Sequence, residues 1–186
     1  MLKYILVFSL FSCASVPAKN HRQFFDDFHT YFEKADFDKM GHLLDDDFII
    51  TNSHGNPDPK TDYIKYMTDW NKTFDTKWHV ISVDNSGDEI KSIEYDTDIF
   101  NDYFYNGKMK YLYTYTFSGD HITRLNAETM PGDDQLRVNF RERFKKFMDW
   151  VSQNHPEKLV FCTKRDKHSA EEIKLLLENY LNNIKI

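Results

Sequence analysis

Residues 35–55 read ADFDKMGHLLDDDFIITNSHG, and this stretch decides how the first part of the chain folds. Asp36 is of a residue type that caps helix N-termini, and apolar residues follow it at the spacing of one helical face. These residues are Phe37, Met40, Leu43 and Leu44. The run FIIT at residues 48–51 then has the composition of a strand. We therefore expect a short helix, a polar corner at residues 45–47 and a first β-strand.

The flanking sequence predicts an α+β domain. Apolar residues recur at helical spacing before the stretch, at residues 20–32, and after it, at residues 62–74. Strand-like segments follow at residues 78–84, 90–101, 109–117 and 121–130. Asn106-Gly107 is typical of a tight hairpin turn between two of them. Helices followed by an antiparallel meander indicate α+β architecture rather than alternating βαβ units.

Pro131-Gly132 marks a boundary, because the chain becomes helical again beyond it. We divide the sequence into a targeting segment and tether at residues 1–19, an α+β domain at residues 20–130 and a helical extension at residues 131–186. Amphipathic helices of this kind are not stable alone, so the extension must pack on the domain, on itself or on another subunit.

The composition limits the classes of partner and cofactor. A net charge of -6 and a pI of about 5.7 argue against a nucleic-acid partner, since such proteins usually carry a basic face. Hydrophobic residues make up 40% of the chain, which is ample for a core. The sequence has no phosphate-binding or dinucleotide glycine pattern, no nucleophile elbow and no metal-ligand spacing. We therefore expect neither a cofactor nor a metal.

The N-terminus has the order of an export signal. Residues 1–3, MLK, are a short positive start, and residues 4–11, YILVFSLF, are apolar but too short to span a bilayer. LFSC at residues 10–13 resembles a bacterial lipobox, which implies that Cys13 carries a lipid and anchors the chain in the cell envelope. Ordinary cleavage after Ala14, which would leave a soluble periplasmic or secreted protein, is the alternative.

Three segments carry a resemblance to a known family: residues 35–55, residues 61–74 (TDYIKYMTDWNKTF) and residues 111–128 (YLYTYTFSGDHITRLNAE). Their order and spacing resemble the nuclear transport factor 2-like superfamily, which includes SnoaL-like polyketide cyclases and steroid Δ-isomerases. The resemblance covers residues 20–130. It implies a cone-shaped fold in which N-terminal helices pack on a curved antiparallel sheet, and the C-terminal extension falls outside it.

The resemblance also implies where isomerase chemistry would lie, and there the residue types do not fit. The position of the catalytic carboxylate falls on Asn52, that of the oxyanion tyrosine on Phe28, and that of the oxyanion acid roughly on Tyr113. An asparagine has no useful basicity, and a phenylalanine cannot donate a hydrogen bond to an oxyanion. Isomerase chemistry by this arrangement is therefore not expected.

His54 is the best remaining candidate for a catalytic base. It lies two residues beyond Asn52, so a strand would direct both side chains to the same side. The competing interpretation is a loop histidine, because Gly55 and Pro57 follow it closely.

The segment at residues 109–117, MKYLYTYTF, suggests a binding wall. Alternate residues place Tyr111, Tyr113 and Tyr115 on one face, which the resemblance directs into the cone. An apolar wall with hydroxyl groups suits a small apolar or aromatic molecule, although an ordinary core with paired hydroxyls would look the same. The candidate ligand-binding residues are Asn52, Tyr111, Tyr113, Tyr115, Phe28 and Trp70.

Glu94, Asp96 and Asp98 alternate along the strand expected at residues 90–101. Like charges adjacent on one face repel, and burying all three would cost much free energy. We therefore expect a solvated outer face here rather than a catalytic pair.

Three functions follow from these patterns. The first is a non-catalytic, envelope-tethered domain that binds a small ligand or a protein partner. The second is an exported SnoaL-like cyclase, dehydratase or isomerase that uses His54 as its base. The third is an assembly module that forms a homodimer through its sheet.

The lipobox interpretation makes a direct prediction. Replacing Cys13 with Ala removes the thiol that accepts the lipid, so Cys13→Ala should abolish membrane retention or stop processing. Membrane fractionation with metabolic labelling by a fatty acid measures this, and Cys162→Ala is the matched control. Unchanged membrane retention of Cys13→Ala would contradict the lipid anchor.

Overall fold

The computed structural model describes residues 21–52 and 57–184. The helices are α1 (His21–Glu33), α2 (Phe37–His42), α3 (Lys60–Tyr66), α4 (Lys72–Phe74), α5 (Ile99–Tyr105), α6 (Asp134–Asn154) and α7 (Lys167–Ile184). A π-helical segment, η1 (Met67–Asn71), joins α3 to α4, and two short 3-10 helices, η2 (Pro156–Lys158) and η3 (Phe161–Thr163), lie between α6 and α7. The strands are β1 (Leu44–Asn52), β2 (Pro57–Pro59), β3 (Lys77–Ser86), β4 (Glu89–Thr97), β5 (Lys110–Ser118) and β6 (His121–Thr129). Within these ranges, no helix is both long and apolar enough to cross a membrane.

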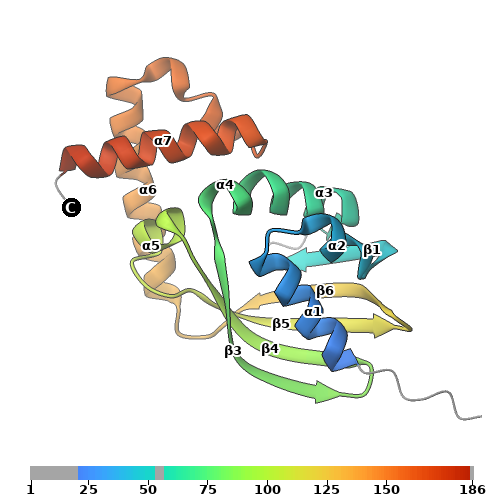
Figure 1. Ribbon diagram of the computed structural model, residues 1–186. Coiled ribbons are helices and arrows are strands. Elements are labelled where there is room, and N and C mark those ends of the chain that lie inside the picture. Colours follow the sequence, from blue (N-terminus) through green and yellow to red (C-terminus); the bar gives the residue numbers. More distant parts are fainter. Residues whose placement is uncertain (1–20, 53–56, 185–186) are drawn as a thin grey trace, which may run out of the picture.

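The strands of the described residues form one mixed sheet in the order β2-β1-β6-β5-β4-β3. β1 runs parallel to β6, and the other neighbouring pairs are antiparallel. Shifts of register interrupt the β1–β6, β3–β4 and β5–β6 ladders, and such bulges bend strands. The sheet is accordingly curved (Figure 1). The predicted α+β architecture is confirmed.

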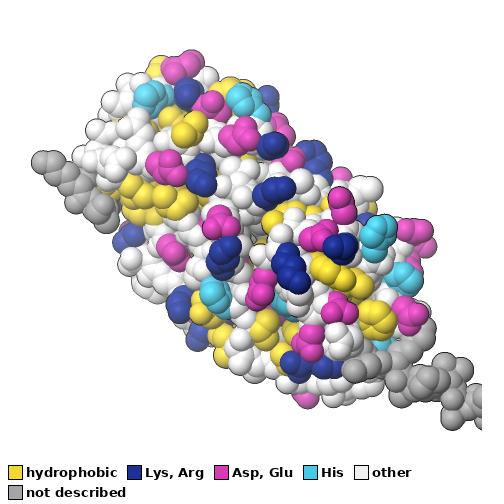
Figure 2. Space-filling view, in the orientation of Figure 1, with side chains coloured by type: hydrophobic (Ala, Val, Ile, Leu, Met, Phe, Trp, Pro, Cys, Tyr) yellow, Lys and Arg dark blue, Asp and Glu magenta, His cyan; other side chains and the backbone are white. Residues whose placement is uncertain are grey.

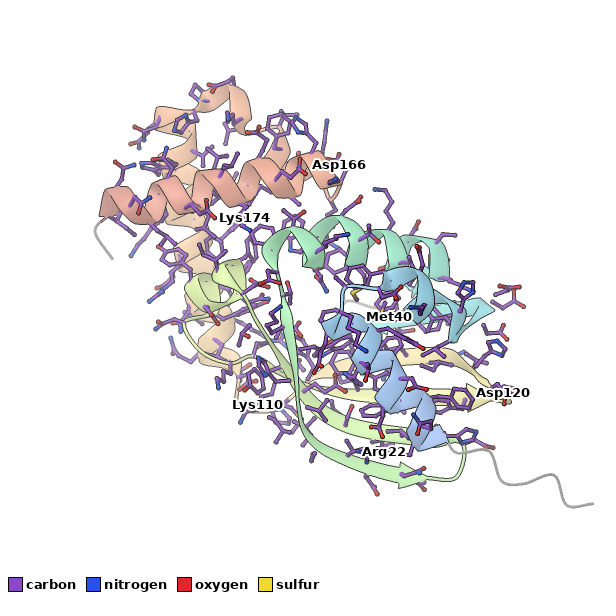
Figure 3. The ribbon with its side chains drawn as sticks, in the orientation of Figure 1. Arg22, Met40, Lys110, Asp120, Asp166 and Lys174 are labelled. Atoms are coloured by element: carbon purple, nitrogen blue, oxygen red, sulfur yellow. The ribbon has the colours of Figure 1, made fainter. Side chains whose placement is uncertain are left out.

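Helices α1, α2 and α3 cover one face of this sheet, which we call the inner face (Figure 1). α1 turns Phe25, Phe28 and Phe32 towards it at helical spacing, and all three are buried. α2 adds Met40, which has no exposed surface (Figure 3). As predicted, Asp36 caps α2, and its side chain accepts a hydrogen bond from the Lys39 backbone N–H. This layer between helices and sheet is the first core of the molecule.

A second core forms where the C-terminal helices meet α5. Its buried members are Phe104, Phe147, Val151, Leu176, Leu177 and Tyr180. The Arg143 guanidinium of α6 donates to the backbone oxygen of Tyr103 at 2.8 Å. α7 also rests on α4: its Lys174 Nζ donates to the Thr73 backbone oxygen at 2.8 Å (Figure 3). The extension therefore packs both on itself and on the preceding domain.

Three details differ from the sequence-based expectations. The aspartates at residues 45–47 lie inside β1 rather than at a corner before it. The strand expected at residues 90–101 ends at Thr97, because Asp98 caps α5 by accepting a hydrogen bond from the Asn101 backbone N–H. Asn106-Gly107 is not a hairpin turn, and Asn106 instead ends α5 in a left-handed conformation with φ 54°. The same Asn-Gly pair serves either purpose, since both need a left-handed backbone.

The surface seen in Figure 2 mixes acidic and basic side chains without a block of one sign. This face therefore does not offer the contiguous basic patch that would track nucleic-acid phosphates.

Removing residues 131–186 tests how far the two cores depend on each other. The deletion would expose Phe104 and Phe74, whose side chains are 0% and 3% exposed in the full chain. Each exposed phenylalanine costs about 1.5–3 kcal/mol of unfolding free energy. We expect the truncated chain to aggregate or to lose its cooperative thermal transition, as measured by circular dichroism. As a control, Leu175→Ser alters a side chain that is already 59% exposed and should melt like the unmodified chain. A soluble, cooperatively melting fragment would contradict this expectation.

Candidate functional site

The inner faces of β4 and β5 meet beneath α1 and α3. In the ladder, Tyr115 lies opposite Ile90, and Tyr113 lies opposite Ser92. Tyr115 and Tyr113 are buried, at 0% and 8% exposure, whereas Tyr111 near the end of the strand is half-buried. The alternation in the sequence therefore directs the tyrosines inward, towards the helices.

The prediction of a solvated outer face at Glu94, Asp96 and Asp98 is wrong. Glu94 has no exposed surface, Asp98 is buried and Asp96 is half-buried. Glu94 and Asp96 share one face of β4, and their pairing with Tyr111 and with the buried Trp78 makes it the inner face. Asp98 has a separate role, because its side chain caps α5 and accepts a hydrogen bond from Thr76 Oγ1 at 2.7 Å.

Glu94 is held by two hydrogen bonds and lies close to a histidine of α1. Its Oε1 accepts from the Tyr115 hydroxyl at 3.1 Å and from the neighbouring Ser92 hydroxyl. His29 of α1 brings its Nε2 to 3.5 Å from the same oxygen and to 3.3 Å from the Tyr115 hydroxyl. Hydrogen bonds of this kind are what make a buried carboxylate tolerable. Sequence reasoning missed His29, although its place on the apolar face of α1 was a usable signal.

Some polar atoms in this first core have no partner within the described residues. They are Glu94 Oε2, the Tyr63 hydroxyl and Trp78 Nε1. Burial raises the pKa of the Tyr63 hydroxyl well above its usual value, and the negative charges of Glu94 and Asp96 raise it further. An unsatisfied buried polar group costs about 1–3 kcal/mol, so such groups call for an explanation.

Asp96 lies at a small cavity of about 10 Å³ near the ends of β4 and β5. The cavity is lined by Asp96, Asn101, Tyr105, Met109 and Tyr111. Burial raises the pKa of the Asp96 carboxyl to about 7, and the charges of Asp98 and Glu94 add to the effect. Burial likewise raises the pKa of Tyr105 and of Tyr111, so both are neutral hydrogen-bond donors at neutral pH. The site therefore combines a carboxyl group that titrates near neutrality with neutral phenols.

The deeper part of the cone is filled by aromatic side chains. Phe28 is fully buried and makes edge contacts with Tyr115 and Trp78, with ring centroids 5.8 and 6.0 Å apart. Trp70 belongs to a different layer, where it stacks on Tyr66 and packs against Phe74. The structure therefore brings together Phe28, Tyr113 and Tyr115, places Tyr111 at the cavity and sets Trp70 apart.

Of the other predicted site residues, the structure describes Asn52 but not His54 or Cys13. Asn52 is the last residue of β1 and pairs with Ala127 of β6. His54 and Cys13 lie outside the described residues. Among the residues described, no group of three or more histidine, cysteine, aspartate or glutamate side chains could hold a metal ion.

A larger hollow of about 380 Å³ lies on the opposite, outer face of the sheet. It is open to solvent and is lined by Thr51, Glu89, Lys91, Thr114, Thr116, Arg124 and Asn126. These residues alternate with the inward tyrosines and acids, so the hollow does not communicate with Asp96 or Glu94 through the sheet. Its polar, mixed-charge lining suits a macromolecular contact better than an apolar ligand.

Comparisons with known proteins bear on the fold. A search with protein-family models finds no match, and a search of curated proteins finds none either. Among solved structures, a protein from Kribbella flavida provisionally assigned as a ketosteroid isomerase aligns with a TM-score of 0.51 and 10% identity, over 60% of this chain and 78% of its own. AclR from Streptomyces galilaeus, provisionally assigned as a hydroxylase, aligns with a TM-score of 0.50 and 12% identity, over 64% of this chain and 84% of its own. A nuclear transport factor 2-like protein of unknown function from Cytophaga hutchinsonii aligns with a TM-score of 0.49 and 15% identity, over 59% of this chain and 89% of its own.

At these identities the likeness concerns the fold alone. The chain has the cone-shaped nuclear transport factor 2-like fold, with helices packed on a curved mixed sheet and a C-terminal helical extension. This confirms the predicted fold class, with one refinement: β1 makes the sheet mixed rather than purely antiparallel.

The raised pKa of Asp96 predicts how stability depends on pH. Between about pH 4 and 7 the unfolded chain has released this proton while the folded chain keeps it, so the free energy of unfolding falls as pH rises through that window. No hydrogen bond to the Asp96 side chain forms within the described ranges. Replacing its carboxyl group with the amide of asparagine therefore breaks no hydrogen bond. We expect Asp96→Asn to raise Tm at pH 8 by about 2–6 °C and to flatten its pH dependence.

Calorimetry at several pH values measures this effect. Glu89→Gln, an acid-to-amide change on the outer face, is the matched control and should leave Tm nearly unchanged. A Tm that falls in Asp96→Asn at every pH would show that the carboxylate is ionised and well stabilised, contrary to this account.

Proposed function

We propose that this chain is an exported, envelope-tethered domain that binds a small molecule in the cone without transforming it. The observation that carries the proposal is a set of buried polar atoms that find no partner in the described part of the chain, beside a wall of aromatic rings. These atoms are Glu94 Oε2, Tyr63 OH and Trp78 Nε1. Binding sites typically combine a mostly apolar lining with a few polar groups that fix orientation. Export and tethering rest on the order of residues 1–13 in the sequence.

Entry is proposed at the cavity beside Asp96, because the deeper cone is filled. A volume of about 10 Å³ holds at most one water molecule, whereas typical ligand sites span about 300–1,000 Å³. A ligand must therefore displace side chains at the rim. Tyr105 and Tyr111 are only half-buried, which makes them the groups best placed to move. This restricts the proposal to ligands about the size of a single ring.

A second candidate is acid–base catalysis at Asp96, and one observation favours it. A carboxyl group with a pKa of about 7 is suited to general acid or base catalysis at neutral pH, and neutral tyrosines beside it can stabilise an oxyanion. In this second candidate function Asp96 would be the catalytic base, the role that the sequence analysis predicts for His54. Binding without turnover is preferred, because the positions of the isomerase base and of its oxyanion donor carry Asn52 and Phe28.

The outer hollow supports a separate proposal about assembly. Glu89 lies there beside Lys91 and Arg124, so the surface carries both signs of charge. A two-fold axis could place each acid against a base of a second copy. A homodimer through the sheet would therefore be compatible with a ligand in the cone, since the two use opposite faces.

Titration with three single-ring probes tests the binding proposal. Benzyl alcohol, benzylammonium and benzoate would be added separately to the isotope-labelled full chain, and backbone amide signals followed by NMR. We expect at least one probe to shift the amides of Asp96, Asn101 and Tyr111 with a Kd below about 1 mM. Met109→Phe fills the cavity and should weaken that binding about tenfold, whereas Thr114→Phe adds the same ring on the outer face and should not.

Thermal melting would confirm that both variants fold. If none of the three probes shifts the amides around the cavity, the binding proposal is wrong. Mass spectrometry of the recovered probe separates the two candidates: an unchanged molecule supports binding, and a product that Asp96→Asn fails to form supports catalysis.

A further inference from the structure

The inner core has an excess of negative charge. Glu94 and Asp96 lie two residues apart on the same face of β4, about 7 Å from each other by strand geometry. Within residues 21–52 and 57–184, neither carboxylate pairs with a lysine or arginine, and the one ionisable base near Glu94 is His29, at 3.5 Å. Opposite charge in a poorly solvated site is worth much more than at the surface. A cation would therefore be attracted to this face of β4, where Asp96 lines the small cavity.

An independent observation concerns hydrogen bonding rather than charge. Glu94 Oε2 and the Tyr63 hydroxyl are both completely buried, and neither has a partner in the described parts of the chain. The carboxylate oxygen can only accept, and a phenol oxygen can accept as well as donate. Both atoms therefore have unused lone pairs, in the core rather than in the lining of the cavity at Asp96. Tyr63 belongs to the same electrostatic neighbourhood, since the charges of Glu94 and Asp96 both raise its pKa.

The walls around Asp96 are of a kind that stabilises organic cations. Tyr105 and Tyr111 line the cavity, and the charge of Asp96 raises the pKa of both hydroxyls beyond the effect of burial. Tyr66 on α3 responds to Asp96 in the same way. Neutral phenol rings attract cations through their faces, an interaction of about 0.5–2 kcal/mol per contact. Met109 adds a flexible apolar surface that adapts to different shapes.

We propose that the cone mouth binds a small organic ammonium ion, with its N–H groups on Asp96 and its hydrocarbon part against Met109 and the tyrosines. This inference rests on the proposed binding function and names the chemical class of the ligand. Glu94 lies on the same strand face outside the lining of the cavity, so it would act on the ligand through its charge alone. An anion would meet two carboxylates, and a neutral alcohol would gain nothing from their charge.

Isothermal titration with the same three ring compounds tests the charge preference at pH 8. Benzylammonium, benzyl alcohol and benzoate differ mainly in the group that would meet Asp96. We expect the full chain to bind benzylammonium at least tenfold more tightly than benzyl alcohol and to show no binding of benzoate. Asp96→Asn should weaken benzylammonium at least tenfold and change benzyl alcohol less than twofold. Glu89→Gln removes an equal charge from the outer face and should change neither.

The outcomes distinguish ligand binding in the cone from a preference for cations. If benzyl alcohol or benzoate binds as tightly as benzylammonium, the cone binds ligands but the preference for cations is wrong. A tenfold loss of benzylammonium affinity in Glu89→Gln with no loss in Asp96→Asn would place the cation on the outer face and overturn the inference. If no compound binds, both the inference and the proposed function fail.

Discussion

The burial of the Glu94 carboxylate is the constraint around which the cone is organised. A carboxylate without exposed surface is stable in a folded protein only if its lone pairs are hydrogen-bonded. Ser92 of β4 and Tyr115 of β5 donate hydrogen bonds to one oxygen, and His29 of α1 lies 3.5 Å from it, so a single group links the sheet to the helix that covers it. Within residues 21–52 and 57–184 the other oxygen has no partner, so this junction of the fold also carries an unsatisfied acceptor.

The aromatic residues around Glu94 explain why the cone is closed rather than hollow. Phe28, Tyr115 and Trp78 meet edge to face, an arrangement that favours tight packing. A small cavity lies where β4 ends and α5 begins, next to the Asp98 cap of that helix. The α5 helix in turn provides Phe104, on which the C-terminal helices build their own core. The cavity thus lies where the two cores meet.

Periodicity in the sequence was a reliable guide to elements and a poor guide to the site. The helical spacing of Phe25, Phe28 and Phe32 and the alternation of the tyrosines in β5 predict the elements and their buried faces, as the structure has them. His29 escaped notice because a histidine among phenylalanines resembles an ordinary helix position. Asp98 was assigned to a strand, since alternation continues unchanged into a residue that caps a helix.

The sequence by itself determined the α+β class, the order of helices and strands and the fact that the tyrosines of β5 share one face, because these depend on local spacing and on the free energy of burying apolar side chains. Only the tertiary structure decided that the acidic face of β4 points inward. Repulsion between neighbouring acids argued for solvent exposure, but partners distant in the sequence reverse that balance: Tyr115 lies 21 residues from Glu94, and His29 lies on another element. Hydrogen bonds between remote residues leave no periodic trace in a single sequence, so the register of β4 against β5 and the docking of α1 settled the matter.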